Sequence, residues 1–225
     1  MMDLCYYCQN RSKAANALDE KQMEKLGHHC NSVLFEKGEK ILIQNDLSHH
    51  IIYIQNGLVK VHAKGVKREQ ILKVVKSPCY LGIPTTLSSK INTFSITAIS
   101  KTNVCFVEAP IFKEFVINNG NFAFEIIVEL CKNELYFFNK ALNQMQKQVP
   151  GKVADALLYF SNEIFEKDNF ELPLTRRELG DMTCSSRESV SRVLSDFRNN
   201  KIIEINKKEI KILNKNSLER IAATG

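Results

Sequence analysis

The chain has 225 residues, of which 44% are hydrophobic and 25% charged, and its formal net charge is +6. This is ordinary globular composition with enough length for two domains, so a buried core is expected. No apolar run approaches the roughly 18 residues that span a membrane. The first residues also lack the basic start and apolar block of a secretory signal, so we expect a cytoplasmic protein.

The pattern of residues 33–108 predicts a series of short strands. Asn56-Gly57, inside residues 51–65, is the strongest short signal for a β-hairpin. Polar residues, Gly and Pro separate the other β-rich segments, which are 33–44, 69–75, 93–100 and 103–109. Almost no helical periodicity interrupts them, so the pattern predicts a β-sandwich, roll or barrel.

A long helix is predicted from about Asn121 to Gln148, where the chain has neither Pro nor Gly. Apolar side chains recur at helical spacing on one broad stripe: Ile127, Leu130, Cys131, Phe137, Phe138, Ala141, Leu142 and Met145. A helix of this length is about 40 Å long, more than a small β-domain needs as a cover. The stripe fits either a simple lid or a dimer seam.

The segment after this helix predicts a second, compact domain. Pro150 and Gly151 predict a hinge at residues 149–152. An amphipathic helix at 152–166, an extended segment at 169–175, two short helices and a final hairpin complete the chain. The hairpin pairs residues 201–205 with 209–213, so the arrangement is a helical domain ending in a β-wing.

The two short helices share a start signal. Thr175 with Glu178, and Ser185 or Ser186 with Glu188, have the Ser/Thr-to-Glu spacing in which each side chain caps the other's backbone. Two such helices joined by a tight turn form a helix-turn-helix. We expect six apolar residues to face inward and lock the pair: Leu179, Met182, Val190, Val193, Leu194 and Phe197.

One face of the second helix is then left free, and it carries Arg187, Glu188, Ser191 and Arg192. Arginine can donate two hydrogen bonds to one guanine, and glutamate can accept a hydrogen bond from cytosine. Glu188 and Arg192 are four positions apart on the helix, so their opposite charges can hold each other in place. The same residues also fit an ordinary solvated face. Residues 176–220 hold eleven Lys/Arg against seven Asp/Glu, a net charge of +4, and this balance, together with the wing, favours DNA binding.

The sequence resembles the Crp/Fnr superfamily of bacterial transcription regulators across nearly its whole length. The stretches that carry the resemblance are "FEKGEKILIQND", "IIYIQNGLVKV", "PCYLG", "VPGKVADALL" and, most specifically, "TRRELGDMTCSSRESVSRVL". It implies an α+β chain in which a cyclic-nucleotide-binding-like β-roll (a double-stranded β-helix or jelly roll) senses an effector. A long dimerisation helix and a winged helix-turn-helix follow.

This resemblance implies domains at 1–120 (β-roll), 121–148 (long helix), 149–152 (hinge) and 153–225 (DNA-binding domain). It also implies a homodimer paired through the long helix, which binds a pseudo-palindrome with a TGA-like half-site core. The other partners it implies are double-stranded DNA, RNA polymerase and a small-molecule effector. The residues implied to read bases are Arg187, Glu188, Ser191 and Arg192, and those implied to contact phosphates are Thr175, Arg176, Ser186 and Ser189. Cys184 departs from the Gly that the family often has in the turn.

The family's cyclic-AMP pocket needs a Gly-Glu pair and, about ten residues on, Arg-Ser. Here Gly82 is followed by Ile83, and the second position reads Asn92-Thr93. Burying a phosphate without a cation is costly, and Lys90 is a weaker substitute than an arginine fork. We therefore expect no cyclic AMP. The expected effector pocket comprises Leu81, Gly82, Ile83, Asn92, Thr93, Phe137 and Phe138.

The cysteines give the alternative hypothesis, a metal- or redox-sensing regulator. Cys5 and Cys8 form a Cys-x-x-Cys pair, and His28, His29 or Cys30 could complete a zinc or iron–sulfur site. The oxygen-sensing branch has a third cysteine where this chain has Ala14. Two free or buried thiols are the simpler interpretation, so no metal or cofactor is predicted. A cupin-like enzyme fits poorly because the β-region lacks a His-x-His pair, and we expect no enzymatic activity.

Overall fold

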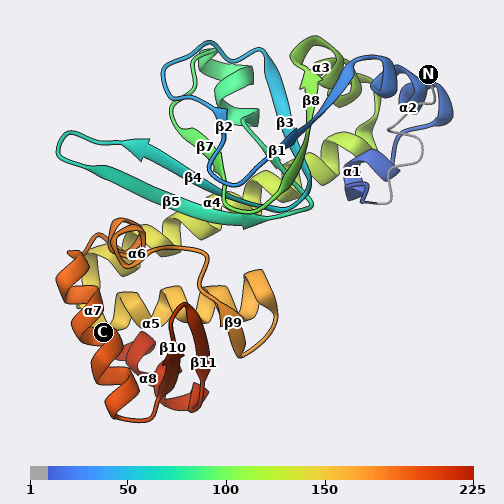
Figure 1. Cartoon of the computed structure of the whole chain (residues 1–225). Coiled ribbons are helices and arrows are strands. Elements are labelled where there is room, and N and C mark those ends of the chain that lie inside the picture. The colour runs from blue at the N-terminus through green and yellow to red at the C-terminus, as the bar shows by residue number, and fades with distance from the viewer. Residues whose placement is uncertain (1–9) are drawn as a thin grey trace. The chain divides into compact units, whose positions relative to one another are not determined.

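A computed structural model describes residues 10–225 and divides the chain into two compact units (Figure 1). The first comprises the residues up to Lys64 and Leu72–Leu135, and the second comprises Gly65–Ile71 and Tyr136–Gly225. Within residues 10–225, no helix combines the length and the apolar character needed to cross a membrane.

The first unit is built on two four-stranded sheets, with strand orders β1-β8-β3-β6 and β2-β7-β4-β5. The strands are β1 (Cys30–Phe35), β2 (Lys40–Leu42), β3 (His50–Asn56), β4 (Leu58–Lys64), β5 (Glu69–Lys76), β6 (Cys79–Leu81), β7 (Ser95–Ala98) and β8 (Thr102–Glu108). This confirms the α+β fold class and the β-roll expected from the sequence.

Strand β3 contains the continuous apolar run "IIYI", and both faces of this strand are buried. Ile52 and Ile54 point into the core between the two sheets, whereas Ile51 and Tyr53 belong to a second core on the other face. Successive side chains of a strand point to opposite faces. A strand covered on both faces therefore reads as continuously apolar, not as alternating.

The predicted hairpin at Asn56-Gly57 is wrong. The strands lie where the sequence places them, but β3 pairs with β6 and β8 while β4 belongs to the other sheet. Gly57 therefore turns a corner between sheets. Its φ of +107° suits glycine, and an added Cβ would lie 2.5 Å from Oγ1 of Thr102.

Helices cover the outer face of the β1-β8-β3-β6 sheet, and their side chains complete the second core. They are α1 (Lys13–Asn16), α2 (Glu20–His28), α3 (Ala109–Asn118) and the first half of α4 (Gly120–Gln146). Helices α1 and α2 are not among the elements predicted from the sequence. A signal for α2 was present, because Asp19 and Gln22 form a reciprocal capping box.

Helix α4 has one face against its own chain and one face exposed. Phe122 and Ile126 are buried in the first unit, and Leu130 packs against the same core. The exposed apolar residues recur every three or four positions on the opposite face: Phe124, Ile127, Cys131, Leu135, Phe138, Leu142 and Met145. Of the expected seam residues, Leu130 thus packs within its own chain. Phe124 and Leu135, which are not among the expected seam residues, lie on the exposed face.

Residues 149–152, where the sequence predicts a hinge, are helical. Only Lys147 and Gln148 separate α4 from α5 (Val149–Tyr159), and Pro150 lies in the first turn of α5. Proline is tolerated there because the first amides of a helix have no partner within it. The four domain ranges remain predictions.

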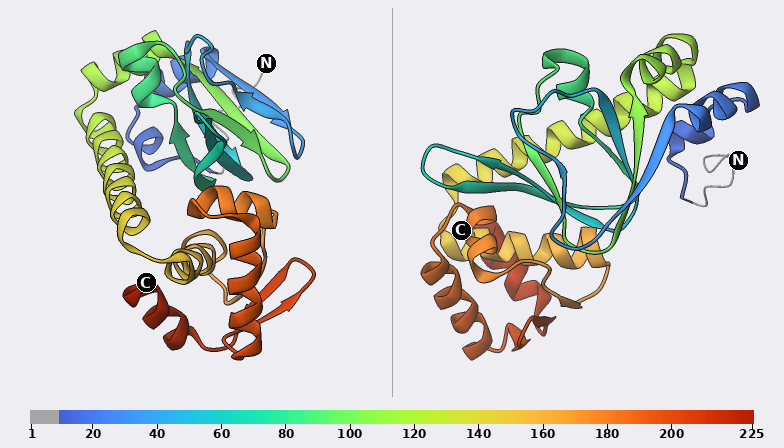
Figure 2. Two further views of the ribbon diagram at one scale, coloured as in Figure 1. Left: turned by 90° about the vertical axis from the view of Figure 1, so that its left-hand side faces the viewer. Right: turned by 45° about the horizontal axis from the view of Figure 1, so that its top comes forward.

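The second unit is a winged helical domain, and Figure 2 gives two further views of it. After α5 come β9 (Asn169–Glu171), α6 (Arg176–Thr183), α7 (Arg187–Asn199), β10 (Ile203–Asn206), β11 (Glu209–Ile212) and α8 (Lys215–Thr224). Strands β10 and β11 pair as predicted, and β9 extends their sheet. Helix α8 is not among the elements predicted from the sequence, although Asn214 caps its start.

Candidate nucleic-acid interface

The caps of α6 and α7 differ from each other. Thr175 and Glu178 form the predicted capping box, in which Thr175 N donates to Oε2 of Glu178 at 2.9 Å. In α7 the cap is Ser186, whose Oγ accepts from Ser189 N at 3.1 Å. Residue Glu188 is one position too early to complete a capping box. Its expected bond back to the cap is therefore wrong, and its side chain is exposed.

The turn between the helices is tight. Ser185 N donates to the Gly180 carbonyl at 2.9 Å, and a Cβ on Gly180 would lie 2.8 Å from the Ser185 carbonyl oxygen. Cys184 ends α6 with a φ of +53°, the left-handed region that favours glycine. The departure from glycine noted in the sequence therefore coincides with backbone strain.

Cys184→Gly is expected to stabilise the protein by about 1 kcal/mol, because glycine has no Cβ to oppose this conformation. Urea unfolding followed by circular dichroism measures the change. Cys184→Ala is the matched control, since alanine keeps a Cβ and should leave the midpoint near that of the wild type. Equal midpoints for the glycine and alanine variants would contradict the strain argument.

The predicted apolar lock is confirmed. All six inward side chains are buried: Leu179, Met182, Val190, Val193, Leu194 and Phe197. Strand β10 also contacts α7. The opposite side of α7 is consequently left to solvent.

That free side carries the predicted base-reading residues. Arg187, Glu188 and Arg192 are exposed, while Ser191 is half-buried and its carbonyl accepts from Oγ of Ser195. Among the described residues no ion pair joins Glu188 to Arg192, so the expected mutual support of these two is not formed. The exposed side chains of Arg187, Glu188 and Arg192 form a ridge at the start of α7, which we call the Arg-Glu-Arg ridge. Base reading by these residues stays a prediction.

A cleft of about 410 Å³ lies beside this ridge. Its charged lining residues are all cations: Arg176, Arg177, Arg187, Lys207 and Lys208. Of these five cations, only Arg176 and Arg187 are among the site residues predicted from the sequence. The Lys-Lys pair between β10 and β11 was visible in the sequence, but its place beside α6 depends on the fold of the wing.

Arg176, in the lining of the cleft, has a hydrogen-bond donor without an acceptor. Its Nη1 is buried and has no hydrogen-bond partner among the described residues, and burial lowers the pKa of its guanidinium. An anionic oxygen in the cleft would satisfy this donor and offset the repulsion among the cations. The other expected phosphate contacts, Thr175, Ser186 and Ser189, have hydroxyls engaged within the caps.

The expected effector residues are only partly gathered in the β-roll. Ile83 and Asn92 are buried, Gly82 has a φ of +81°, and Thr93 is exposed. Asn92 lines a cavity of about 220 Å³ with His50 and Phe106. Its Oδ1 is buried without a partner among the described residues, whereas its Nδ2 donates to the Ile43 carbonyl at 3.2 Å. Leu81 is half-buried, and Phe137 and Phe138 lie on exposed parts of α4.

The cysteine hypothesis can be followed only in part, because Cys5 and Cys8 lie outside the described residues. Cys30 is half-buried on β1, and its hydrogen bond lowers the pKa of Cys105 on the neighbouring strand β8. His29 faces Glu108, with 3.3 Å between Nδ1 and Oε1. Within residues 10–225, no three His, Cys, Asp or Glu side chains are grouped to hold a metal ion.

Comparison with known proteins agrees with this division. Residues 32–119 match the family described as "Cyclic nucleotide-binding domain", and residues 151–221 match "Crp-like helix-turn-helix domain". The chain is 26% identical over 230 residues to the nitrogen fixation regulation protein FixK of Bradyrhizobium diazoefficiens, covering 97% of this chain and 94% of that protein. It is 21% identical over 217 residues to a CRP-like cAMP-activated global transcriptional regulator of Mycobacterium tuberculosis, covering 94% and 97%.

Solved structures show the same fold. FixK2 from Bradyrhizobium japonicum superimposes with a TM-score of 0.79 at 19% identity, covering 87% of this chain and 98% of that one. A transcriptional regulator of the CRP family from Thermus thermophilus superimposes with a TM-score of 0.73 at 20% identity, covering 86% and 97%.

Proposed function

Because this chain belongs to the Crp/Fnr superfamily of transcription regulators, we propose that it is a homodimeric, cytoplasmic regulator that binds a pseudo-palindromic DNA site. The half-site core resembles TGA, and RNA polymerase is the partner through which transcription changes. The observation that carries this proposal is the exposed Arg-Glu-Arg ridge of α7 beside a cleft whose charged lining is entirely cationic.

The ridge and the cleft suit two different parts of a duplex. Side chains at the start of a helix placed in the major groove reach base edges, and arginine and glutamate can distinguish them there. The cations of the cleft, which come from α6 and from the wing, suit the phosphates that flank the groove. Phosphate contacts fix the register of the helix on the duplex without reading sequence.

The exposed stripe of α4 supports the homodimer. Six large apolar side chains on it are between 52% and 77% exposed: Phe124, Ile127, Leu135, Phe138, Leu142 and Met145. Leaving them in water is unfavourable, and a second copy of the same helix would cover them with coiled-coil spacing. In helix-turn-helix dimers the two recognition helices enter successive major grooves, and we propose the same for two copies of this chain.

The effector is proposed to be a molecule other than cyclic AMP. A cyclic phosphate needs a cation or several donors around it, but the buried atom without a partner here is the acceptor Oδ1 of Asn92. Lys90, the cation considered as a substitute, is exposed. Two acceptors facing each other repel, so the residues present do not fit the nucleotide. Effector binding then shifts the population of DNA-competent dimers.

Selection of bound sites from random duplex DNA tests the proposal directly. Enrichment of a pseudo-palindrome with TGA-like half-sites is the expected result, and enrichment of no sequence would contradict it. Repeating the selection in air and under anaerobic conditions, with metal analysis of the protein, tests the alternative in which the cysteines sense metal or redox state.

The wing lysines are expected to contribute to affinity and not to sequence preference. The double variant Lys207→Ala/Lys208→Ala removes four lysines from the proposed homodimer. The slope of log K against log[salt] should become shallower by about 2–4, since each phosphate contact contributes about 1. Fluorescence anisotropy over a salt series measures this slope. Lys13→Ala/Lys113→Ala removes the same charge from exposed positions in the first unit and should leave it unchanged. An unchanged slope in the wing variant would place the phosphates elsewhere.

A further inference from the structure

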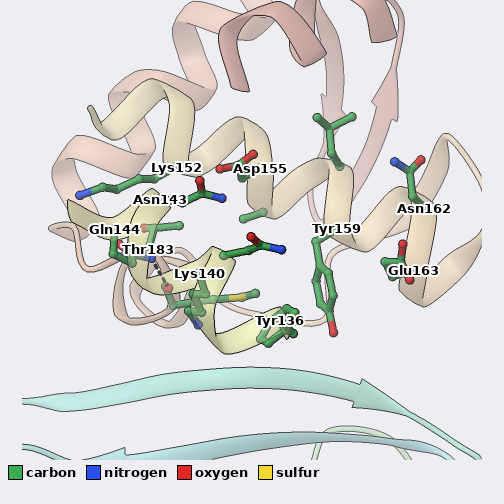
Figure 3. A pocket seen from close by; sticks show the side chains of 14 residues that line it. Tyr136, Lys140, Asn143, Gln144, Lys152, Asp155, Tyr159, Asn162, Glu163 and Thr183 are labelled. Carbon is green, nitrogen blue, oxygen red and sulfur yellow. Dashed lines mark hydrogen bonds between the residues drawn. The ribbon is translucent and has the colours of Figure 1, made fainter. Parts of the chain in front are cut away.

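The second unit contains a cavity that the DNA-binding proposal does not use (Figure 3). Its volume is about 300 Å³, and it is bounded by the last part of α4, by α5 and by the end of α6. All of its lining residues belong to the second unit. Concave sites of this size that combine apolar walls with a few polar groups are typical of small-molecule binding.

Gln144, one of the lining residues, has a buried polar atom without a hydrogen-bond partner. The amide of Gln144 donates from Nε2 to the Met182 carbonyl at 3.3 Å, while its Oε1 is buried and has no hydrogen-bond partner among the described residues. A buried acceptor without a donor costs free energy. A ligand that presents an N–H group to Oε1 would remove this cost.

Two tyrosines form an aromatic part of the wall. The ring centroids of Tyr136 on α4 and Tyr159 on α5 are 5.6 Å apart, with a tilt of 48° between the rings. Figure 3 shows both rings at the same side of the cavity. Burial raises the pKa of Tyr136, so its hydroxyl stays neutral. Flat aromatic molecules gain from contact with such rings.

Four charged side chains line the cavity: Lys140, Lys152, Asp155 and Glu163. Nζ of Lys140 donates to the Ile71 carbonyl at 3.1 Å. Asp155 is neutralised by Lys147, whose Nζ lies 2.6 Å from its Oδ2. Lys152 lies at one end of the cavity, and Glu163 lies at the other end (Figure 3). An acidic group on a ligand would therefore be stabilised near Lys152 and repelled near Glu163.

We propose that this cavity binds a small heteroaromatic acid. The ring packs against Tyr136 and Tyr159, a ring N–H donates to Oε1 of Gln144, and the acidic group lies near Lys152. Such a ligand contacts α4, α5 and the end of α6, so it ties the long helix to the first helix of the helix-turn-helix. The consequence for DNA binding rests on the proposed function, but the binding itself does not.

Three probes separate these contributions in the full-length protein. Indole-3-carboxylate has the ring, the N–H donor and the acid; 1-methylindole-3-carboxylate lacks the donor, and indole lacks the acid. Ligand-observed NMR titration without DNA is expected to rank indole-3-carboxylate tightest by about tenfold over each of the others, as expected for the loss of one hydrogen bond or one ion pair. No binding at millimolar concentration, or equal binding of the two acids, would overturn the proposal.

Matched variants locate the site. Gln144→Met removes the acceptor at similar volume and should abolish the preference for the N–H compound. Gln146→Met makes the same change at an exposed position of α4 outside the cavity and should preserve it. If both variants keep the preference, the indole is bound elsewhere and the assignment fails. Because these titrations contain no DNA, their outcome is independent of whether the chain regulates transcription.

Discussion

Arg192→Ala is expected to lose discrimination at one base pair of each half-site, at a cost of about 1–3 kcal/mol. The side chain is exposed on the free face of α7, where a guanidinium can fork onto the two acceptors of guanine. Alanine cannot replace these bonds. Affinity for the selected site should fall towards the affinity for unrelated DNA, which depends mainly on phosphate contacts.

Anisotropy titrations against the selected duplex and its single-base variants measure this effect. Arg198→Ala is the matched control, because it removes the same charge from an exposed position in the last turn of the same helix. The control should weaken binding slightly and equally for all duplexes. If Arg192→Ala keeps the wild-type preference at every position, Arg192 does not read a base.

Phe138→Asp is expected to separate the proposed dimer into monomers. The side chain is 60% exposed on α4 in the single chain, and pairing of two helices would bury one new carboxylate from each copy in an apolar seam. Burying an unpaired charge is among the most costly changes known in proteins. Dimerisation should weaken by about a hundredfold or more, which corresponds to about 3 kcal/mol, and binding to the full pseudo-palindrome should fall with it.

Sedimentation velocity over a concentration series measures the assembly state, and circular dichroism checks that the variant is folded. Lys132→Asp is the control, because it introduces the same carboxylate at an exposed position of α4 outside the apolar stripe. It should sediment as the wild type does. A Phe138→Asp variant that remains a dimer and binds the full site normally would remove α4 from the assembly interface.

Much of the second unit was predictable because its signals are local. The capping box of Thr175 and Glu178, the helical spacing of the apolar lock and the turn at Lys207-Lys208 each depend on residues within a few positions of one another. The same locality explains a failure. Two serines compete for the cap of α7, and only the tight turn at Gly180 shows that Ser186 takes that role.

The sequence by itself determined most of the strands, the long helix and the two helices of the helix-turn-helix. It also determined which residues of the helix-turn-helix point inward, and that Arg187, Glu188 and Arg192 share a free face. Only the tertiary structure decided how strands pair and which distant residues meet. Asn56-Gly57 predicts a turn equally well within one sheet or between two, because sheet pairing depends on hydrogen bonds to strands far away in the chain. The cationic cleft likewise joins α6 to the wing, and no periodicity relates segments about thirty residues apart.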